Sequence, residues 1–81
     1  MTKKLRLSVI SPSGTILCAE ASGVTLPLTD GYCGILPGHG EMIAVTTAGT
    51  LKYSLEGAEN SVEIGAGIAK VDADSVTVLT A

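Results

Sequence analysis

Hydrophobic and polar residues alternate along most of the chain with a period of two. Residues 4–9 read Lys-Leu-Arg-Leu-Ser-Val, and residues 51–56 and 62–66 repeat the same alternation. Successive side chains of a β-strand point to opposite faces, so this pattern predicts strands with one buried face and one exposed face. No window carries a convincing stripe of apolar residues at helical spacing. The pattern therefore predicts a chain built from strands.

Short segments rich in Gly, Pro, Asp and Ser separate the predicted strands. We expect nine strands, at residues 5–9, 16–18, 24–26, 33–36, 42–47, 51–55, 62–66, 68–71 and 76–80. The third is expected to stop at Pro27, and residues 56–60 to form a polar loop. Gly65 and Gly67, inside a strand-like run, predict a bulge or close backbone packing. The fold expected for residues 1–81 is one all-β domain, an antiparallel β-sandwich or flattened barrel.

Composition narrows the function classes. The chain has 81 residues, 46% of them hydrophobic, and its only aromatic residues are two tyrosines, so the core is predicted to be aliphatic. With five basic and eight acidic residues, nucleic-acid binding has little electrostatic support. No run approaches the roughly 20 apolar residues of a membrane-spanning helix, and no signal peptide is visible, so we expect a soluble, cytoplasmic protein without direct membrane insertion. Cys18 and Cys33 are expected to be reduced thiols.

Residues 30–40 read Asp-Gly-Tyr-Cys-Gly-Ile-Leu-Pro-Gly-His-Gly and contain the only histidine of the chain. Catalysis by His39 lacks any supporting motif, and a metal site would need three or four ligands where only His39 and Glu41 are at hand. A phosphate-binding loop would need a helix after its glycines, but the strand-like run 42–47 follows. We therefore expect no catalytic residue, metal or cofactor, and an interaction module rather than an enzyme.

The run Gly-Ile-Leu-Pro-Gly-His at residues 34–39 closely resembles a segment of the epsilon subunit of the F-type ATP synthase. Further matches follow in order at residues 5–12, 14–17, 24–31, 49–51 and 75–79, so the resemblance covers nearly the whole chain. It implies a β-sandwich of about ten strands. It also implies a non-catalytic central-stalk subunit, located at the cytoplasmic face of the inner membrane, that binds the gamma subunit and the c ring and couples rotation to ATP synthesis.

The resemblance also implies roles for nine residues. Those expected to contact the gamma subunit are Ser11, His39 and Ala44; those expected to contact the c ring are Asp30, Gly31 and Tyr32; those expected to shape the loop are Gly34, Pro37 and Gly38. Tyr32 stands where family members often carry an acid, and Gly40-Glu41 replaces a common Ala-Pro. His39 either contacts gamma or hydrogen-bonds within its own loop, and both remain open. Gly31, Gly34 and Gly38 are expected to serve backbone conformation.

Typical bacterial epsilon subunits continue into two inhibitory α-helices, whereas no amphipathic helical pattern remains after residues 76–79. The expectation is a coupling subunit without that inhibitory arm, whether the chain is a short form or a truncated one. Two other readings stay open. A free-standing β-sandwich adaptor would be favoured if the expected gamma-facing surface were charged or buried. A small hydrolase would be favoured by a cleft that joins His39 to a serine or to Cys33.

Overall fold

Nine β-strands and no helix make up the part of the chain that the computed structural model describes, residues 3–81. The strands are β1 (Leu5–Ser11), β2 (Gly14–Ala21), β3 (Gly23–Leu28), β4 (Gly31–Ile35), β5 (Met42–Thr46), β6 (Gly49–Leu55), β7 (Ala58–Ile64), β8 (Gly67–Val71) and β9 (Ser75–Thr80). The nine predicted strands are confirmed, although β2 is much longer than the expected residues 16–18 and β7 begins before the expected residues 62–66. Within residues 3–81 no helix is available that could cross a membrane.

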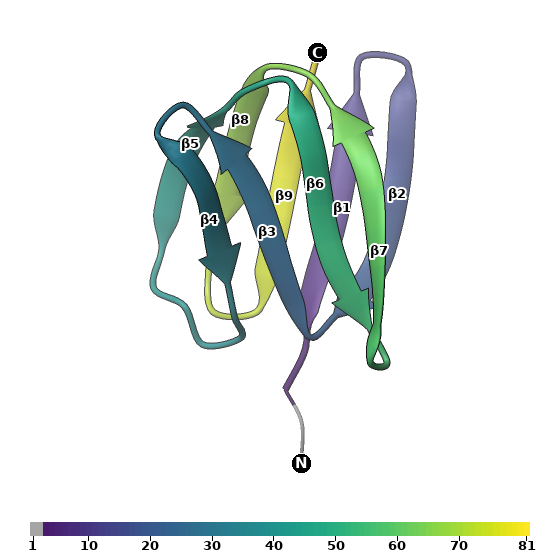
Figure 1. Ribbon diagram of the computed structural model, residues 1–81, viewed down its shortest axis with the longest axis vertical. Helices are drawn as coiled ribbons and strands as arrows, with labels where there is room; N and C mark the ends of the chain where they lie inside the picture. The colour runs from purple at the N-terminus through teal and green to yellow at the C-terminus, as the bar shows by residue number, and fades with distance from the viewer. Residues whose placement is uncertain (1–2) are drawn as a thin grey trace.

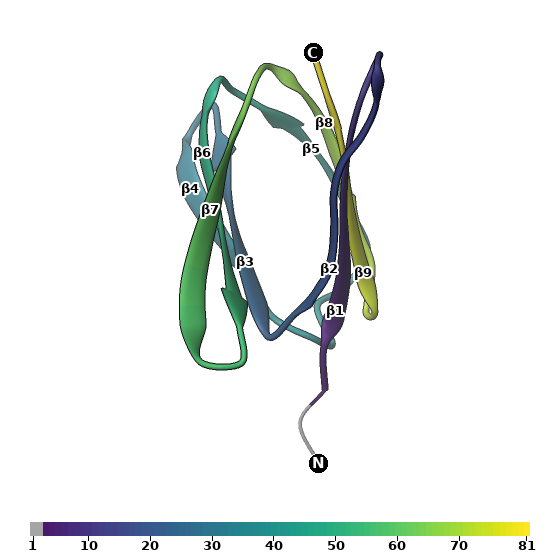
Figure 2. The ribbon, with the colours of Figure 1, turned by 90° about the vertical axis from the view of Figure 1, so that its right-hand side faces the viewer.

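The strands form two layers that face each other. One layer has the order β2-β1-β9-β8-β5, and the other consists of β4, β3, β6 and β7 (Figures 1 and 2). The layers are joined where the end of β5 reaches β3, at the pair Leu28 and Thr46. The all-β sandwich predicted from the sequence is thus confirmed, as one curled sheet folded over on itself.

Aliphatic side chains from both layers fill the space between them. Thirteen hydrophobic residues are buried: Leu5, Leu7, Val9, Ala21, Val24, Leu26, Ile35, Leu51, Ile64, Ala69, Val71, Val76 and Val78. They occupy alternate positions of their strands, as the period of two requires. Tyr53 is partly buried and packs against this cluster. The predicted aliphatic core is confirmed.

One strand pair departs from the antiparallel arrangement expected from the sequence. β1 and β9 run parallel, with Leu7 beside Val76 and Val9 beside Val78. The expectation rested on neighbouring strands joined by short turns, which always pair antiparallel. β1 and β9 are instead the first and last strands, joined only through the rest of the chain, so no turn fixes their relative direction.

Gly67 lies where two backbones meet closely, as its position within a strand-like run predicted. A Cβ atom at Gly67 would overlap the carbonyl oxygen of Leu79 on β9. At nearby Gly65 the backbone N–H donates a hydrogen bond to the Thr80 hydroxyl at 2.7 Å, and the Gly65 carbonyl accepts one from the Thr46 hydroxyl at 3.4 Å. These bonds satisfy the hydroxyl groups of two threonines that are otherwise enclosed by the core.

The expected stop at Pro27 and the expected loop at residues 56–60 were wrong. β3 continues through Pro27 to Leu28, because Pro27 still accepts a hydrogen bond at its carbonyl, from the Thr47 N–H at 2.9 Å. The polar loop expected at residues 56–60 is a two-residue turn, Glu56 and Gly57, between β6 and β7. Both residues have positive φ, 51° and 81°, which is the signature of the type I′ turn that matches the twist of a hairpin.

Candidate interaction surfaces

The loop at residues 36–41 leads from β4 to β5 and contains a tight turn. The His39 N–H donates to the Leu36 carbonyl at 3.1 Å across Pro37 and Gly38. Gly38 has a φ of 89°, and proline followed by a residue of positive φ is the preferred sequence of a type II turn. The expected loop-shaping roles of Pro37 and Gly38 agree with this geometry.

His39 makes a hydrogen bond within its own loop. Its Nδ1 lies 2.8 Å from the Gly40 carbonyl oxygen, and since a carbonyl only accepts, the Nδ1–H donates. A neutral ring with the proton on Nδ1 carries a lone pair on Nε2, which can accept a hydrogen bond. The local hydrogen bond left open by the sequence is therefore present, and a contact between His39 and gamma stays a prediction.

The β8–β9 turn is organised by the side chain of Asp72. Asp72 Oδ1 accepts hydrogen bonds from the N–H groups of Asp74 and Ser75 at 2.9 and 2.8 Å, and Oδ2 accepts one from the Ser75 hydroxyl at 3.0 Å. Such bonds favour the charged form of a carboxyl group. The hydrogen bond from the Asp74 N–H, followed by those from Ser75 and by the nearby charge of Lys70, lowers the pKa of Asp72 below its ordinary value.

The same turn reaches two other segments through its backbone. The Ala73 carbonyl accepts a hydrogen bond from the Gly38 N–H at 2.9 Å, and the Asp74 carbonyl accepts one from the Arg6 N–H at 2.8 Å. The loop of His39 is thereby attached to the β8–β9 turn, at the end of the sandwich where β4 and β8 finish (Figure 1).

The expected c-ring residues lie at the opposite end of the sandwich, where β3 turns into β4 (Figure 1). Asp30 is exposed in the turn. Gly31 begins β4 with a φ of 117°, a backbone conformation that glycine adopts far more readily than other residues. Tyr32 pairs with Pro27 of β3 and is 66% exposed. Charge, aromatic area and a hydroxyl are therefore available together at this tip.

Gly34 differs from the other glycines singled out in the sequence. It lies in the middle of β4, opposite Thr25, and not in the loop. Its φ is not in the left-handed region, and a Cβ atom there would meet nothing within 4 Å. The expectation that Gly34 shapes the backbone is therefore wrong, because neither strain nor crowding requires glycine at this strand position.

Ser11 lies at the end of β1 and holds the turn into β2. Its hydroxyl is 3.0 Å from the Ser13 hydroxyl, donates to the Gly14 carbonyl at 3.1 Å and accepts from the Ser13 N–H at 3.3 Å. This turn lies at the same end of the sandwich as the β3–β4 turn, away from the His39 loop (Figure 1). Ser11 thus has a local structural role, and its contact with gamma stays a prediction.

The outer surface of the β1-β9-β8-β5 layer carries large exposed aliphatic side chains. Val45, Ile68, Leu79 and the half-buried Ile10 are paired in register across the four strands, and Ile43 adds a second position on β5. Exposed fractions are 74% for Ile43, 61% for Val45, 53% for Leu79 and 49% for Ile68. We call these five residues the apolar face. Contiguous exposed aliphatic side chains of this kind mark interaction sites.

Ala44 lies on β5 but does not belong to the apolar face. In β5 the side chains of Met42, Ala44 and Thr46 point toward the core, and those of Ile43 and Val45 point outward. The resemblance implied a gamma contact at Ala44, whereas its two outward-facing neighbours were not expected to take part. Their signal was available, because residues 42–45 read Met-Ile-Ala-Val without the polar alternation of the other half-buried strands.

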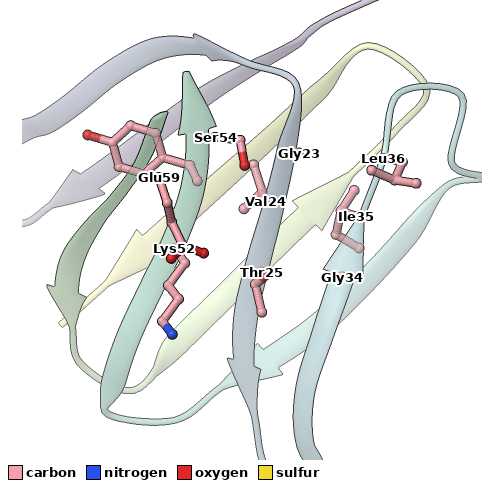
Figure 3. Close-up of a pocket in the computed structure, with 10 residues that line it drawn as sticks. Gly23, Val24, Thr25, Gly34, Ile35, Leu36, Lys52, Ser54 and Glu59 are labelled. Carbon is pink, nitrogen blue, oxygen red and sulfur yellow. The ribbon is translucent and has the colours of Figure 1, made fainter. Parts of the chain in front are cut away.

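The outer surface of the other layer is mainly polar. A shallow depression of about 340 Å³ lies over β3, β4 and β6 and is lined by Thr25, Gly34, Leu36, Lys52, Ser54 and Glu59, among others (Figure 3). Lys52 and Glu59 bring opposite charges to it. Leu36 and Leu55 are exposed at this layer, but exposed aliphatic side chains paired in register across strands lie only on the other layer among residues 3–81.

Cys33 and His39, two residues considered for hydrolysis, have different surroundings. Cys33 lies on β4 and is partly buried against the core, whereas His39 lies beyond the turn and bonds to Gly40. Among residues 3–81, no group of three or more His, Cys, Asp or Glu side chains is placed to hold a metal ion.

Comparison with known proteins agrees with the fold. Residues 4–81 match the family described as ATP synthase, Delta/Epsilon chain, beta-sandwich domain. The ATP synthase epsilon chain of Synechococcus sp. (strain WH7803) is 41% identical over 75 residues, which are 93% of this chain and 55% of that protein. The epsilon chain of Lawsonia intracellularis is 41% identical over 80 residues, 99% of this chain and 60% of that protein. The chain thus spans well under two thirds of these relatives.

A solved structure shares the architecture. A chain in the cryo-EM structure of the Euglena gracilis mitochondrial ATP synthase, OSCP/F1/c-ring, superposes with a TM-score of 0.87 at 24% identity, covering 95% of this chain and 50% of that one. The family match extends over nearly every described residue and agrees with the observed sandwich. The chain therefore belongs to the family of ATP synthase delta and epsilon chain β-sandwich domains.

Proposed function

We propose that this chain is a non-catalytic subunit of the central stalk of a proton-translocating F-type ATP synthase. In this role it binds the gamma subunit and the c ring and helps to couple rotation of the ring to ATP synthesis. It is a peripheral subunit at the cytoplasmic face of the inner membrane. Family membership and the epsilon-chain relatives support this proposal.

The observation that carries the proposal is the apolar face. Ile43 and Val45 are 74% and 61% exposed in the isolated chain, although each could bury most of its side chain against a partner. Burying one such side chain contributes about 1.5–3 kcal/mol. A surface of this kind favours a lasting protein contact, and we assign it to the gamma subunit. Its five side chains are uncharged, and the charged residues Glu41 and Lys70 lie beside it at Ile43. A mainly apolar surface argues against the alternative of an unrelated adaptor, which would be favoured by a charged or buried one.

The residues expected to contact gamma lie beside this face along the chain. Ser11 directly follows Ile10 on β1, His39 lies in the loop that leads into β5, and Ala44 lies between Ile43 and Val45. Ser11 and His39 are at opposite ends of the sandwich, so a partner that touches both would extend along the whole layer. Ala44 would contribute through its backbone and its two neighbours.

We assign the β3–β4 turn to the c ring. Tyr32 supplies exposed aromatic area and one hydroxyl, and Asp30 beside it supplies a carboxylate. An aromatic side chain with a polar end suits an interface with polar loops. Asp30 takes the place of the acid that the resemblance leads one to expect at position 32.

The test is binding to purified gamma subunit from the same cell, measured by calorimetry. Wild-type chain should bind at micromolar concentration or below, and Ile68→Asp should weaken binding at least about tenfold, the equivalent of 1.4 kcal/mol. Ser61→Asp, an exposed position on β7 of the polar layer, is the matched control and should leave affinity unchanged. No binding by the wild type, or equal loss in both variants, would refute the assignment.

His39→Ala separates a contact from a structural role. It should weaken gamma binding more than it lowers the free energy of unfolding. If thermal stability falls sharply and the affinity of the folded fraction is unchanged, then His39 serves only its own loop.

A further inference from the structure

The β8–β9 turn attaches two distant segments through adjacent peptide groups. The carbonyl of Ala73 accepts from the Gly38 N–H, and the carbonyl of Asp74 accepts from the Arg6 N–H, at 2.9 and 2.8 Å. One bond fixes the loop that carries His39, and the other fixes the beginning of β1. The orientation of these two carbonyl groups therefore matters for both segments.

Asp72 holds the same two peptide groups from their other side. The Ala73 carbonyl shares a peptide plane with the Asp74 N–H, and the Asp74 carbonyl shares one with the Ser75 N–H. Both N–H groups donate to Asp72 Oδ1, at 2.9 and 2.8 Å. In a trans peptide the N–H and C=O point in opposite directions. By binding both N–H groups, the carboxylate therefore turns both carbonyl groups away from itself, toward Gly38 and Arg6.

Among the hydrogen bonds of residues 3–81, the one from the Gly38 N–H is the only one that joins the turn at residues 36–39 to another segment. The turn's internal hydrogen bond, from the His39 N–H to the Leu36 carbonyl, sets the shape of the turn but not its position on the sandwich. The Gly38 N–H is the donor that the internal turn leaves unused, and it is the one that reaches Ala73. The hydrogen bond from His39 to Leu36 thus sets the shape of the loop, and the one from Gly38 to Ala73 sets its position on the sandwich.

We propose that Asp72 is the positioning residue of the His39 loop, acting through the peptide between Ala73 and Asp74 on the Gly38 amide. The effect on loop position follows from this chain alone. Its effect on gamma binding rests on the proposed function: a loop already held in place loses less freedom when a partner binds.

The test is amide hydrogen exchange measured by NMR on the full chain. In Asp72→Ala, exchange of the Gly38 amide should accelerate at least about tenfold, while core amides of Leu7 and Val78 change by less than about twofold, the pattern of a local opening. Asp74→Asn is the matched control. It removes a charge from the same turn, where no hydrogen bond of the Asp74 side chain is found among the described residues, and should leave Gly38 unchanged.

Three results would overturn the proposal: no acceleration at Gly38, equal acceleration at Gly38, Leu7 and Val78, or the same acceleration in Asp74→Asn. If Asp72→Ala fails to fold, the Asp72→Asn variant tests the proposal instead. It keeps one acceptor oxygen but loses the charge that strengthens these bonds, so Gly38 exchange should rise about threefold or more. An unchanged rate in a folded Asp72→Asn chain would contradict the proposal.

Binding to gamma then links loop position to function. Asp72→Ala should lower the affinity of the folded chain about fivefold, a loss of the size expected for one released segment. Asp74→Asn should bind like wild type. If the wild-type chain fails to bind gamma, the proposed function fails, and the exchange rates at Gly38 still decide the role of Asp72.

Discussion

The Thr80 hydroxyl accepts a hydrogen bond from the Gly65 N–H at 2.7 Å, next to the edge of the core. Thr80 is 5% exposed, so water cannot readily replace this acceptor. Thr80→Val keeps the shape of the side chain and removes the acceptor. We expect it to lower the free energy of unfolding by about 1–3 kcal/mol, the cost of an unsatisfied buried donor.

Urea denaturation followed by circular dichroism measures this loss. Thr77→Val, on the outer side of the same strand, is the control and should change stability by less than about 0.5 kcal/mol. Equal effects of the two substitutions would show that the hydrogen bond to Gly65 is not what matters.

Two glycines should respond in opposite ways to replacement by alanine. At Gly67 the added Cβ would overlap the Leu79 carbonyl, so β8 and β9 would have to move apart, and we expect a loss of about 3 kcal/mol or more. At Gly34 the space is open and φ is ordinary, so alanine should be neutral or stabilise by up to about 1 kcal/mol. Denaturant unfolding of both variants checks the contrast, and a large loss at Gly34 would contradict it.

Glu56 in the β6–β7 turn has a strained backbone conformation that a substitution could relieve. Glu56 has a φ of 51°, a conformation that asparagine adopts more readily than glutamate. Glu56→Asn should therefore raise the free energy of unfolding by about 0.5–1 kcal/mol. Glu59→Asn, made in β7, should bring no gain because asparagine is unfavourable in strands. A shift in melting temperature measures both, and a gain in Glu59→Asn alone would refute the explanation.

Acid should weaken the β8–β9 turn. The hydrogen bonds to the Asp72 carboxylate lower its pKa in the folded chain below the unfolded value. Its contribution to stability is therefore fully present above about pH 4 and is lost as the pH falls through the folded pKa. Urea midpoints at pH 7 and pH 3 should differ less in Asp72→Asn than in the wild type. Asp74→Asn should keep the wild-type difference, and a wild-type difference in Asp72→Asn would exclude this mechanism.

Alternation of side chains made the sandwich predictable. A half-buried strand repeats every two residues, and β1 shows this directly, with Leu5, Leu7 and Val9 buried. The turn before β5 could also be predicted, because Pro37 has a fixed φ and Gly38 readily adopts the positive φ that a type II turn requires. The end of β3 could not be predicted. Whether a proline ends a strand depends on its hydrogen-bond partner, and the partner of Pro27 is Thr47, which lies far along the chain.

The candidate surface was less predictable than the fold. Residues 42–45 lack polar alternation, which is compatible with two apolar faces on one strand, but the sequence alone does not say which face is buried. The burial pattern of β5 shows that Ile43 and Val45 point outward. The resemblance drew attention to Ala44 between them. The link from Asp72 to Gly38 was invisible for a similar reason: it joins two turns that become neighbours only after the strands have paired.

The parallel pair of β1 and β9 has a consequence for how the chain folds. β1 can form a hairpin with β2 early, but its other edge waits for β9, nearly the whole sequence later. Pairing of such distant segments is slow because a large loop must close first. Until then β1 presents an unpaired edge rich in aliphatic residues, the kind of edge that recruits other chains. Aggregation during synthesis should therefore depend on how soon residues 75–80 become available.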